Sequence, residues 1–225
     1  MGVWEYGSRT RDSCKPPTTN IYSNQKMISF PSNLVLENER VLLRPLQKED
    51  LEFLLPFAEQ EPEIWTYSLV SAAGKTAMTN YIDYTVAQRD QEKEYPFIIF
   101  DKQANAFAGS SRFYDIQLPN LTTTLGYTWY GKKFRRTGLN RHCKMLMLGY
   151  AFEHWGMERV EFRADGRNSA SIEAMKSIGC TVEGILRSTY PIQSGGRKDT
   201  IVLAILKNEW FDSVKKNLEG KIRQV

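Results

Sequence analysis

The segment from Thr123 to Tyr150 constrains the fold more than any other part of the chain. A strand-like run ends at Tyr130, a basic turn containing glycine follows, and a helix begins inside that turn. From Lys132 to Lys144 there are six basic residues and no acidic one. Free N–H groups in the first turn of a helix favour an anion. The segment therefore predicts a phosphate-binding turn, with an ordinary solvated loop as the alternative.

Composition is compatible with one globular domain. The chain has 225 residues, of which 41% are hydrophobic, enough to bury a full core. The net charge of +4 is smaller than the charge of the basic turn alone, so the positive charge is local. Anionic ligands are favoured. Nucleic-acid binding is less favoured, because the basic residues form one short loop and no recognisable binding module is present.

Cysteine and histidine usage predicts neither a disulfide framework nor a metal site. Cys14, Cys143 and Cys180 are far apart and odd in number, which favours a reducing, cytoplasmic environment. His142 and His154 are twelve residues apart on one expected helix and so lie on different faces. No apolar run approaches the roughly 18 residues of a membrane span, and the first residues lack the apolar core of a signal peptide.

The chain divides into three parts. Residues 1–33 are rich in polar residues, Pro and Gly and are expected to form an extension, disordered in part. Residues 34–210 carry the periodic segments of a folded domain, and residues 211–225 are expected to form a polar tail helix. The domain is expected to contain strands at 41–46, 95–101, 106–116, 123–130, 160–164, 182–187 and 198–206, and helices at 48–59, 74–89, 139–155 and 169–178.

This order of elements predicts a mixed α/β domain. Three consecutive strands without an intervening helix are most simply wired as an antiparallel meander, and the helix after the basic turn provides a crossover to the next strand. Two strands after the last domain helix close the sheet, with Ser194-Gly195-Gly196 turning the chain between them.

Two motifs at helix starts carry a family resemblance. Arg135-Arg136-Thr137-Gly138-Leu139-Asn140 opens the central helix, and Asn168-Ser169-Ala170-Ser171 opens the next. With these, the chain resembles the GCN5-related N-acetyltransferases over about Leu34 to Trp210. It is most similar to the branch that contains the bacterial ribosomal-protein amino-terminal acetyltransferases. The resemblance implies a mostly antiparallel central sheet flanked by helices on both faces, acetyl-CoA as co-substrate, and transfer of the acetyl group to a primary amine.

The resemblance also implies a set of cofactor-binding residues. Arg135, Gly138 and Asn140 occupy the marked positions of the family's Gln/Arg-x-x-Gly-x-Gly/Ala loop, and Asn140 departs from the small residue there. Gly138 allows a close approach of the backbone, and basic side chains would bind the 3′-phosphate. Asn168 and Ser171 would contact the pantetheine or phosphate arm of the cofactor. Capping of the helix is the alternative explanation for these two residue types at this position. The full set is Thr128, Trp129, Tyr130, Arg135, Arg136, Thr137, Gly138, Leu139, Asn140, Arg141, Asn168 and Ser171.

Catalytic side chains are harder to assign. Many related enzymes carry a tyrosine acid seven residues after the motif Asn, but that position is Met175, which reads as a core residue. A glutamate base of some relatives corresponds to Arg163. Ser171 as the acid and Tyr190 as a water-mediated proton acceptor are weak candidates. Asp115 and Glu183 are further candidates for accepting the proton, and each is explained as well by a surface or hairpin role.

Proton chemistry favours an α-amine as acceptor. An α-amino group with a pKa of about 8 is roughly one tenth neutral at pH 7, whereas a lysine amine is neutral less than about one part in a thousand. The expected reaction is direct attack of a neutral amine on acetyl-CoA in a ternary complex. The acceptor is a protein amino terminus or a small-molecule amine. The alternatives are a non-catalytic coenzyme A-binding module and a basic nucleic-acid-binding protein. The sequence leaves the oligomeric state open, a homodimer included.

Overall fold

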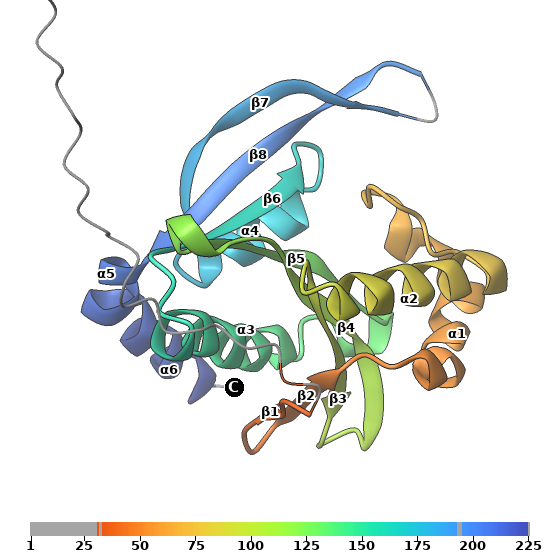
Figure 1. Ribbon diagram of the computed structural model, residues 1–225, viewed down its shortest axis with the longest axis horizontal. Helices are drawn as coiled ribbons and strands as arrows, with labels where there is room; N and C mark the ends of the chain where they lie inside the picture. Colours follow the sequence, from red (N-terminus) through yellow and green to blue (C-terminus); the bar gives the residue numbers. More distant parts are fainter. Residues whose placement is uncertain (1–30, 32, 193–194, 225) are drawn as a thin grey trace, which may run out of the picture.

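A single twisted sheet organises the chain (Figure 1). The computed structural model describes residues 31, 33–192 and 195–224, so nearly all of the expected extension lies outside the described residues. The sheet has eight strands in the order β1-β2-β3-β4-β5-β6-β8-β7. Their bounds are β1 Leu36–Glu37, β2 Val41–Pro45, β3 Tyr95–Asp101, β4 Ala106–Gln117, β5 Thr122–Tyr130, β6 Arg159–Asp165, β7 Thr181–Pro191 and β8 Arg197–Leu206.

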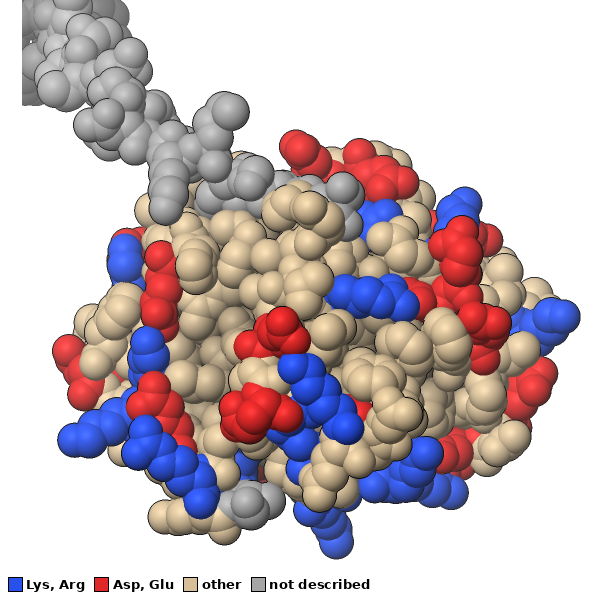
Figure 2. Space-filling model, turned by 90° about the horizontal axis from the view of Figure 1, so that it is seen from below, with Lys and Arg blue, Asp and Glu red and all other residues tan. Residues whose placement is uncertain are grey.

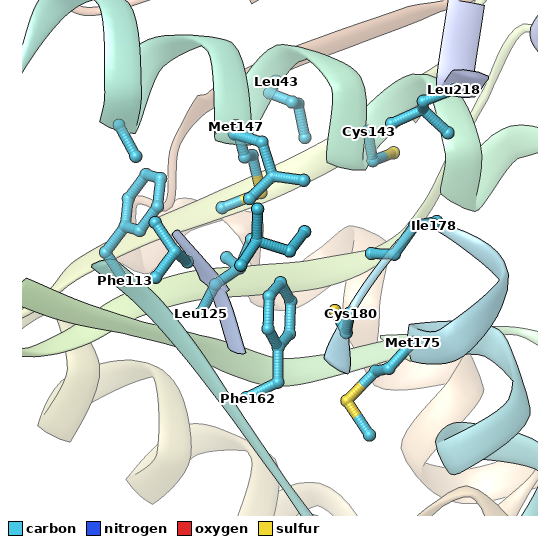
Figure 3. Close-up of a cluster of buried hydrophobic side chains, with 14 of the residues drawn as sticks. Leu43, Phe113, Leu125, Cys143, Met147, Phe162, Met175, Ile178, Cys180 and Leu218 are labelled. Carbon is cyan, nitrogen blue, oxygen red and sulfur yellow. The ribbon is translucent and has the colours of Figure 1, made fainter. Parts of the chain in front are cut away.

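Helices cover both faces of the sheet. On one face lie α1 (Leu51–Gln60) and α2 (Lys75–Asp90), packed over Ile98 and Trp129. On the other lie α3 (Leu139–Gly149), α4 (Ser169–Ser177) and α6 (Lys215–Ile222), preceded by the short α5 (Lys207–Glu209). Figure 3 shows the core of this second face, where Cys143 and Met147 of α3 meet Phe162 of β6 and Ile178 after α4.

The predicted fold class is confirmed, and most elements appear where the periodicity placed them. The meander of β3, β4 and β5 pairs antiparallel, and α3 carries the chain to β6, which pairs parallel to β5. Met175 lies in the core at 8% exposure, as its spacing predicted. Within the described residues, no helix is both long and apolar enough to cross a bilayer.

The structure adds four features to the predicted elements. The two-residue strand β1 pairs with β2, and β7 extends from Thr181 to Pro191, beyond its expected end. β8 inserts between β6 and β7. The interior position suits β8 because its residues Leu203, Ala204 and Ile205 are buried, whereas nearly every side chain of β7 is exposed. The C-terminal helix also packs into the core, with Trp210, Val214 and Leu218 buried against the α3 layer.

Candidate active site

The two parallel strands at the centre of the sheet stay together for only three residues. β5 and β6 pair from Thr122 with Arg159 to Thr124 with Glu161. Beyond these residues β5 continues to Tyr130 and β6 to Asp165, and the two strands no longer pair with each other. A bulge in the β4–β5 ladder, with Tyr127 at a φ of 48°, bends β5 at this point. Each strand therefore has unpaired backbone N–H and C=O groups facing the opening, which an extended ligand can bind. We call this opening the β5–β6 split.

The basic turn lies at the far end of the split. After Gly131 the chain makes one 3-10 turn at Lys132–Phe134, and Arg136 then adopts the left-handed conformation with a φ of 60°. Gly138 caps α3 with a φ of 84°, a conformation that glycine adopts without strain. Since Gly138 supplies no capping side chain, the first N–H groups of α3 keep no local side-chain acceptor.

Side-chain hydrogen bonds fix the turn to the strand that precedes it. The hydroxyl of Tyr130 donates to Oδ1 of Asn140 at 3.1 Å, and Nε of Arg135 donates to the carbonyl of Tyr130 at 3.0 Å. The hydroxyl of Thr137 donates to the carbonyl of Phe134 at 2.8 Å. The Asn140 side chain, which departs from the family's small residue, thus joins β5 to the first turn of α3.

A hollow of about 480 Å³ lies on the outer side of the turn, lined by Lys133, Phe134, Thr137 and the end of the β3–β4 hairpin. Asp101 lies in this hollow but is paired with the guanidinium of Arg40 through two hydrogen bonds of 2.9 Å. These bonds hold the pKa of Asp101 below its usual value despite its burial. Its charge is therefore balanced and opposes an anion at the turn only weakly.

The second motif forms the start of α4. Oδ1 of Asn168 accepts the N–H of Ser171 at 3.1 Å, so Asn168 caps the helix. Just before it, Asp165 at the end of β6 accepts two hydrogen bonds from the Arg167 guanidinium, and Nζ of Lys198 lies 3.5 Å away. The Arg167 hydrogen bonds lower the pKa of Asp165 to about 2. This carboxylate is a structural ion-pair partner and a poor proton acceptor at neutral pH.

The candidate proton-transfer residues lie apart in the structure. Ser171 is half-buried in the first turn of α4, while Tyr190 lies on β7, exposed beneath the Lys198 amine. Asp115 is exposed on β4 and accepts a hydrogen bond from Gln117. Glu183 binds the guanidinium of Arg159. Asp115 and Glu183 therefore have hydrogen-bond partners near the end of the sheet where β5 and β6 are still paired.

Sequence reasoning missed a buried lysine beside the split. Lys144 on α3 is 4% exposed, and its Nζ donates to Oγ1 of Thr128 at 2.7 Å and to Oγ of Ser111 at 3.3 Å. Removal from water lowers the pKa of this amine to about 8. The signal was available, because Lys144 lies four residues after Asn140 and so shares its face of the helix. The charge pattern instead places Lys144 with the basic residues of the turn.

The two described cysteines are inert in this environment. Cys143 and Cys180 are free and buried, and removal from water raises the pKa of their thiols to about 11 and about 12. A thiolate nucleophile at neutral pH needs the opposite shift. In the described part of the chain, no group of three or more His, Cys, Asp or Glu side chains is arranged to hold a metal ion.

The face of the molecule shown in Figure 2 carries no broad basic patch. Figure 2 shows acidic and basic side chains interspersed on the side seen from below in Figure 1. The strongest local excess of positive charge in the sequence remains the turn before α3. This distribution suits a small anionic ligand better than a nucleic-acid backbone.

Residues 40–181 match the model of the acetyltransferase (GNAT) domain family. The match covers more than half of the chain and includes the split, the turn and the start of α4. The chain belongs to the GNAT acetyltransferases. It is thus an enzyme that transfers an acetyl group, and acetyl-CoA is the donor that this family uses.

Relatives and solved structures agree with this assignment. The chain is 23% identical over 176 residues to the uncharacterized N-acetyltransferase p20 of Bacillus licheniformis, covering 78% of this chain and 97% of p20. It is 23% identical to YdaF of Bacillus subtilis, provisionally named a ribosomal N-acetyltransferase, over 77% of this chain and 94% of YdaF. This likeness agrees with the predicted branch. A GCN5-related N-acetyltransferase from Brucella melitensis has the same fold, with a TM-score of 0.77 at 21% identity and coverage of 86% and 87%.

Proposed function

We propose that acetyl-CoA binds with its pyrophosphate on the turn before α3 and its pantetheine arm in the β5–β6 split, and that the acetyl group passes directly to the α-amino group of a polypeptide. The parting of β5 and β6 after Thr124 and Glu161 carries this proposal. It leaves a row of unpaired backbone groups whose far end meets the basic, glycine-capped start of α3.

The pyrophosphate end is supported by geometry and charge. The left-handed conformations of Arg136 and Gly138 turn the backbone so that α3 begins at Leu139 with free amides. Lys133 and Arg136 are exposed beside these amides and supply charge for the 3′-phosphate. Arg135 has a second role, because its bond to the Tyr130 carbonyl holds the turn against β5.

The thioester end lies where Thr128, Trp129 and Tyr130 line the split. Hydrogen bonds from β5 amides would position the pantetheine as an added strand and polarise the thioester carbonyl. Trp129 is buried against α1 and α2, and Tyr130 is held by Asn140. Their side chains therefore keep β5 in place, while their backbone groups remain for the ligand.

Apolar side chains near the split favour a polypeptide acceptor. Tyr67, Leu69 and Val70 precede α2, Ile185, Leu186 and Tyr190 lie on β7, and all six are between 40% and 59% exposed. A chain of contacts links the two groups, because the Arg167 guanidinium lies 5.9 Å from the Tyr67 ring and Lys198 lies 5.6 Å from the Tyr190 ring, with Asp165 between them. Exposed apolar surface on separate elements suits an extended peptide better than a small polar amine.

A protein amino terminus also fits the chemistry. Asp165 and Glu183 are paired with basic groups, which makes both carboxylates poor proton acceptors. An α-amine needs none, because roughly a tenth of it is neutral at pH 7. The provisional name of YdaF, a ribosomal N-acetyltransferase, agrees with a protein substrate.

Thermal-shift measurements test the donor site. We expect acetyl-CoA and free coenzyme A to raise the melting temperature more than ATP does. Gly138→Val forces a β-branched residue into the left-handed conformation and should abolish this shift, whereas Gly220→Ala, with open space around the glycine, should keep it. A full melting-temperature shift in Gly138→Val would place the donor site elsewhere.

Thiol release with hexapeptides bearing free amino termini, compared with spermidine and aminoglycosides, then tests the acceptor class.

A further inference from the structure

The amine of Lys144 is a buried basic group that the proposed donor contacts do not use. It is enclosed by the hydroxyls of Ser111 and Thr128, which also bond to each other at 2.7 Å. None of the ion pairs formed by the described residues includes Lys144, and its pKa is affected only by burial and the two thiols Cys143 and Cys180. A buried lysine without a carboxylate partner costs stability, because its charged form is desolvated.

The position of this amine relates it to the split. Thr128 lies on β5 beyond the last residue paired with β6, and Phe162 is the first residue of β6 after the pairing ends. Nζ of Lys144 bonds to Thr128 and lies 6.0 Å from the centre of the Phe162 ring. It therefore lies on the α3 side of the sheet, next to residues of β5 and β6 at which the two strands have parted. Thr128 is half-buried on the part of β5 that has parted from β6, and its hydroxyl contacts the enclosed amine.

We propose that Lys144, acting through the hydroxyl of Thr128, supplies the proton taken up by the coenzyme A thiolate as it leaves. This inference rests on the proposed placement of the thioester in the split. It assigns the protonation step in a chain whose corresponding helix position is Met175, buried in the core. Thr128 is the catalytic residue in this scheme because it meets the sulfur, and Lys144 is the positioning residue that replaces its proton.

The amine nitrogen of the acceptor attacks the thioester carbon, and the carbonyl electron pair moves to oxygen. On collapse the C–S bond breaks and its electron pair stays on sulfur. Oγ1 of Thr128 gives its proton to that sulfur and takes one from Nζ of Lys144. The new amide nitrogen releases its extra proton to water, and water returns a proton to Lys144.

The surroundings make Lys144 a suitable proton source near neutral pH. Its pKa of about 8 is close to the working pH, which favours rapid transfer in either direction. The titratable groups around it are Cys143 on its own helix and Cys180 after α4, which keep their protons until about pH 11 and 12. Ser111 from β4 and Thr128 from β5 do not titrate in this range. The buried ammonium also opposes the negative charge that forms on oxygen and sulfur.

The test is steady-state kinetics from pH 6 to 10 with acetyl-CoA and the best peptide of the panel. Slow hydrolysis of acetyl-CoA serves as the readout if no peptide reacts. Lys144→Met should lower kcat by at least about 100-fold while changing the KM for acetyl-CoA little. Lys144→Arg keeps the charge but cannot release its proton, so the decrease in kcat above about pH 8 that is expected of the wild type should be absent. Thr128→Val should match Lys144→Met, the double variant should be no slower than either single one, and Thr128→Ser should retain activity.

Controls separate this inference from the proposed function. Lys176→Met removes an exposed lysine of α4 and should leave kcat unchanged. Each variant is first checked for its acetyl-CoA thermal shift. A wild-type protein without that shift would contradict the donor site itself. An intact shift, with Lys144→Met or Lys144→Arg showing wild-type kcat and an unchanged pH profile, would overturn only the role of Lys144. Additive losses in the double variant would overturn the relay through Thr128.

Discussion

The hydroxyl of Tyr130, at the end of β5, donates a hydrogen bond of 3.1 Å to Oδ1 of Asn140 in the first turn of α3. This bond spans the basic turn and joins the two elements that the turn connects. Removal from water raises the pKa of the Tyr130 phenol well above its ordinary value, so the phenol remains a donor at all physiological pH values. A small residue at position 140 could not make this connection.

Replacing Asn140 with Ala should cost about 1 kcal/mol of unfolding free energy, because the Tyr130 hydroxyl keeps only the weakly accepting Cys143 thiol nearby. Urea denaturation measures the loss. Tyr130→Phe and the double variant complete a mutant cycle. If the two single losses simply add, the bond contributes nothing and this account of Asn140 fails.

Gly109→Ala should destabilise the β4–β5 ladder strongly. A Cβ at this position would lie 2.0 Å from the carbonyl oxygen of Trp129, and the backbone must move to relieve the contact. We expect a loss of about 3 kcal/mol or more, seen as a lower melting temperature in circular dichroism. Gly184→Ala on β7 is the matched control, since nothing lies within 4 Å of its added Cβ, and it should change stability by less than about 1 kcal/mol. Equal losses would contradict the close approach.

The thiols of Cys143 and Cys180 should react slowly with Ellman's reagent at pH 8 in the native protein and rapidly after denaturation. Their raised pKa values keep them protonated, and burial blocks access. The measurement uses a Cys14→Ser background so that only these two thiols are counted. Mass spectrometry after incubation with acetyl-CoA should find no acetyl group on either cysteine. Rapid native labelling or an acetylated cysteine would support a covalent intermediate instead.

Lys144→Met should stabilise the protein by about 2 kcal/mol at pH 7, because it removes a buried charge at the expense of two hydrogen bonds. The folded pKa of about 8 lies below the ordinary 10.5, so between these values the unfolded chain binds more protons than the folded one. Wild-type stability therefore gains from this group as pH rises through that window, and the advantage of Lys144→Met should shrink.

Paired denaturation curves at pH 7, 9 and 10.5 measure that difference. Cys143 and Cys180 act in the opposite direction, since their raised pKa values give stability that is complete below about pH 9 and is lost as pH rises toward 11 and 12. Both proteins carry these thiols, and the comparison between pH 7 and pH 9 lies below the range in which they lose their protons. A constant difference across the three pH values would show that Lys144 titrates normally.

Local patterns in the sequence accounted for the elements and for the glycine-capped basic turn before α3. The run from Thr123 to Tyr130 became β5, and the apolar residues after Gly138 became the buried face of α3. Asn168 caps α4 as its residue type predicted. These features depend on neighbours within a few residues, which is the range over which sequence periodicity and capping rules operate.

Contacts between segments that are distant in the sequence could be identified only in the structure. The insertion of β8 between β6 and β7 depends on which strand buries more apolar surface against the whole sheet, a comparison that no local pattern contains. The burial of Lys144 depends on Ser111 and Thr128, which lie 33 and 16 residues away along the chain.

The sequence by itself determined that a basic, glycine-capped turn leads from a strand into a helix, because backbone conformation and charge at Gly138 and its neighbours are local properties. Only the tertiary structure decided that β5 and β6 part after Thr124 and that the amine of Lys144 lies below this point. Strand pairing and desolvation depend on groups brought together by folding, and the chemistry of the split follows from both.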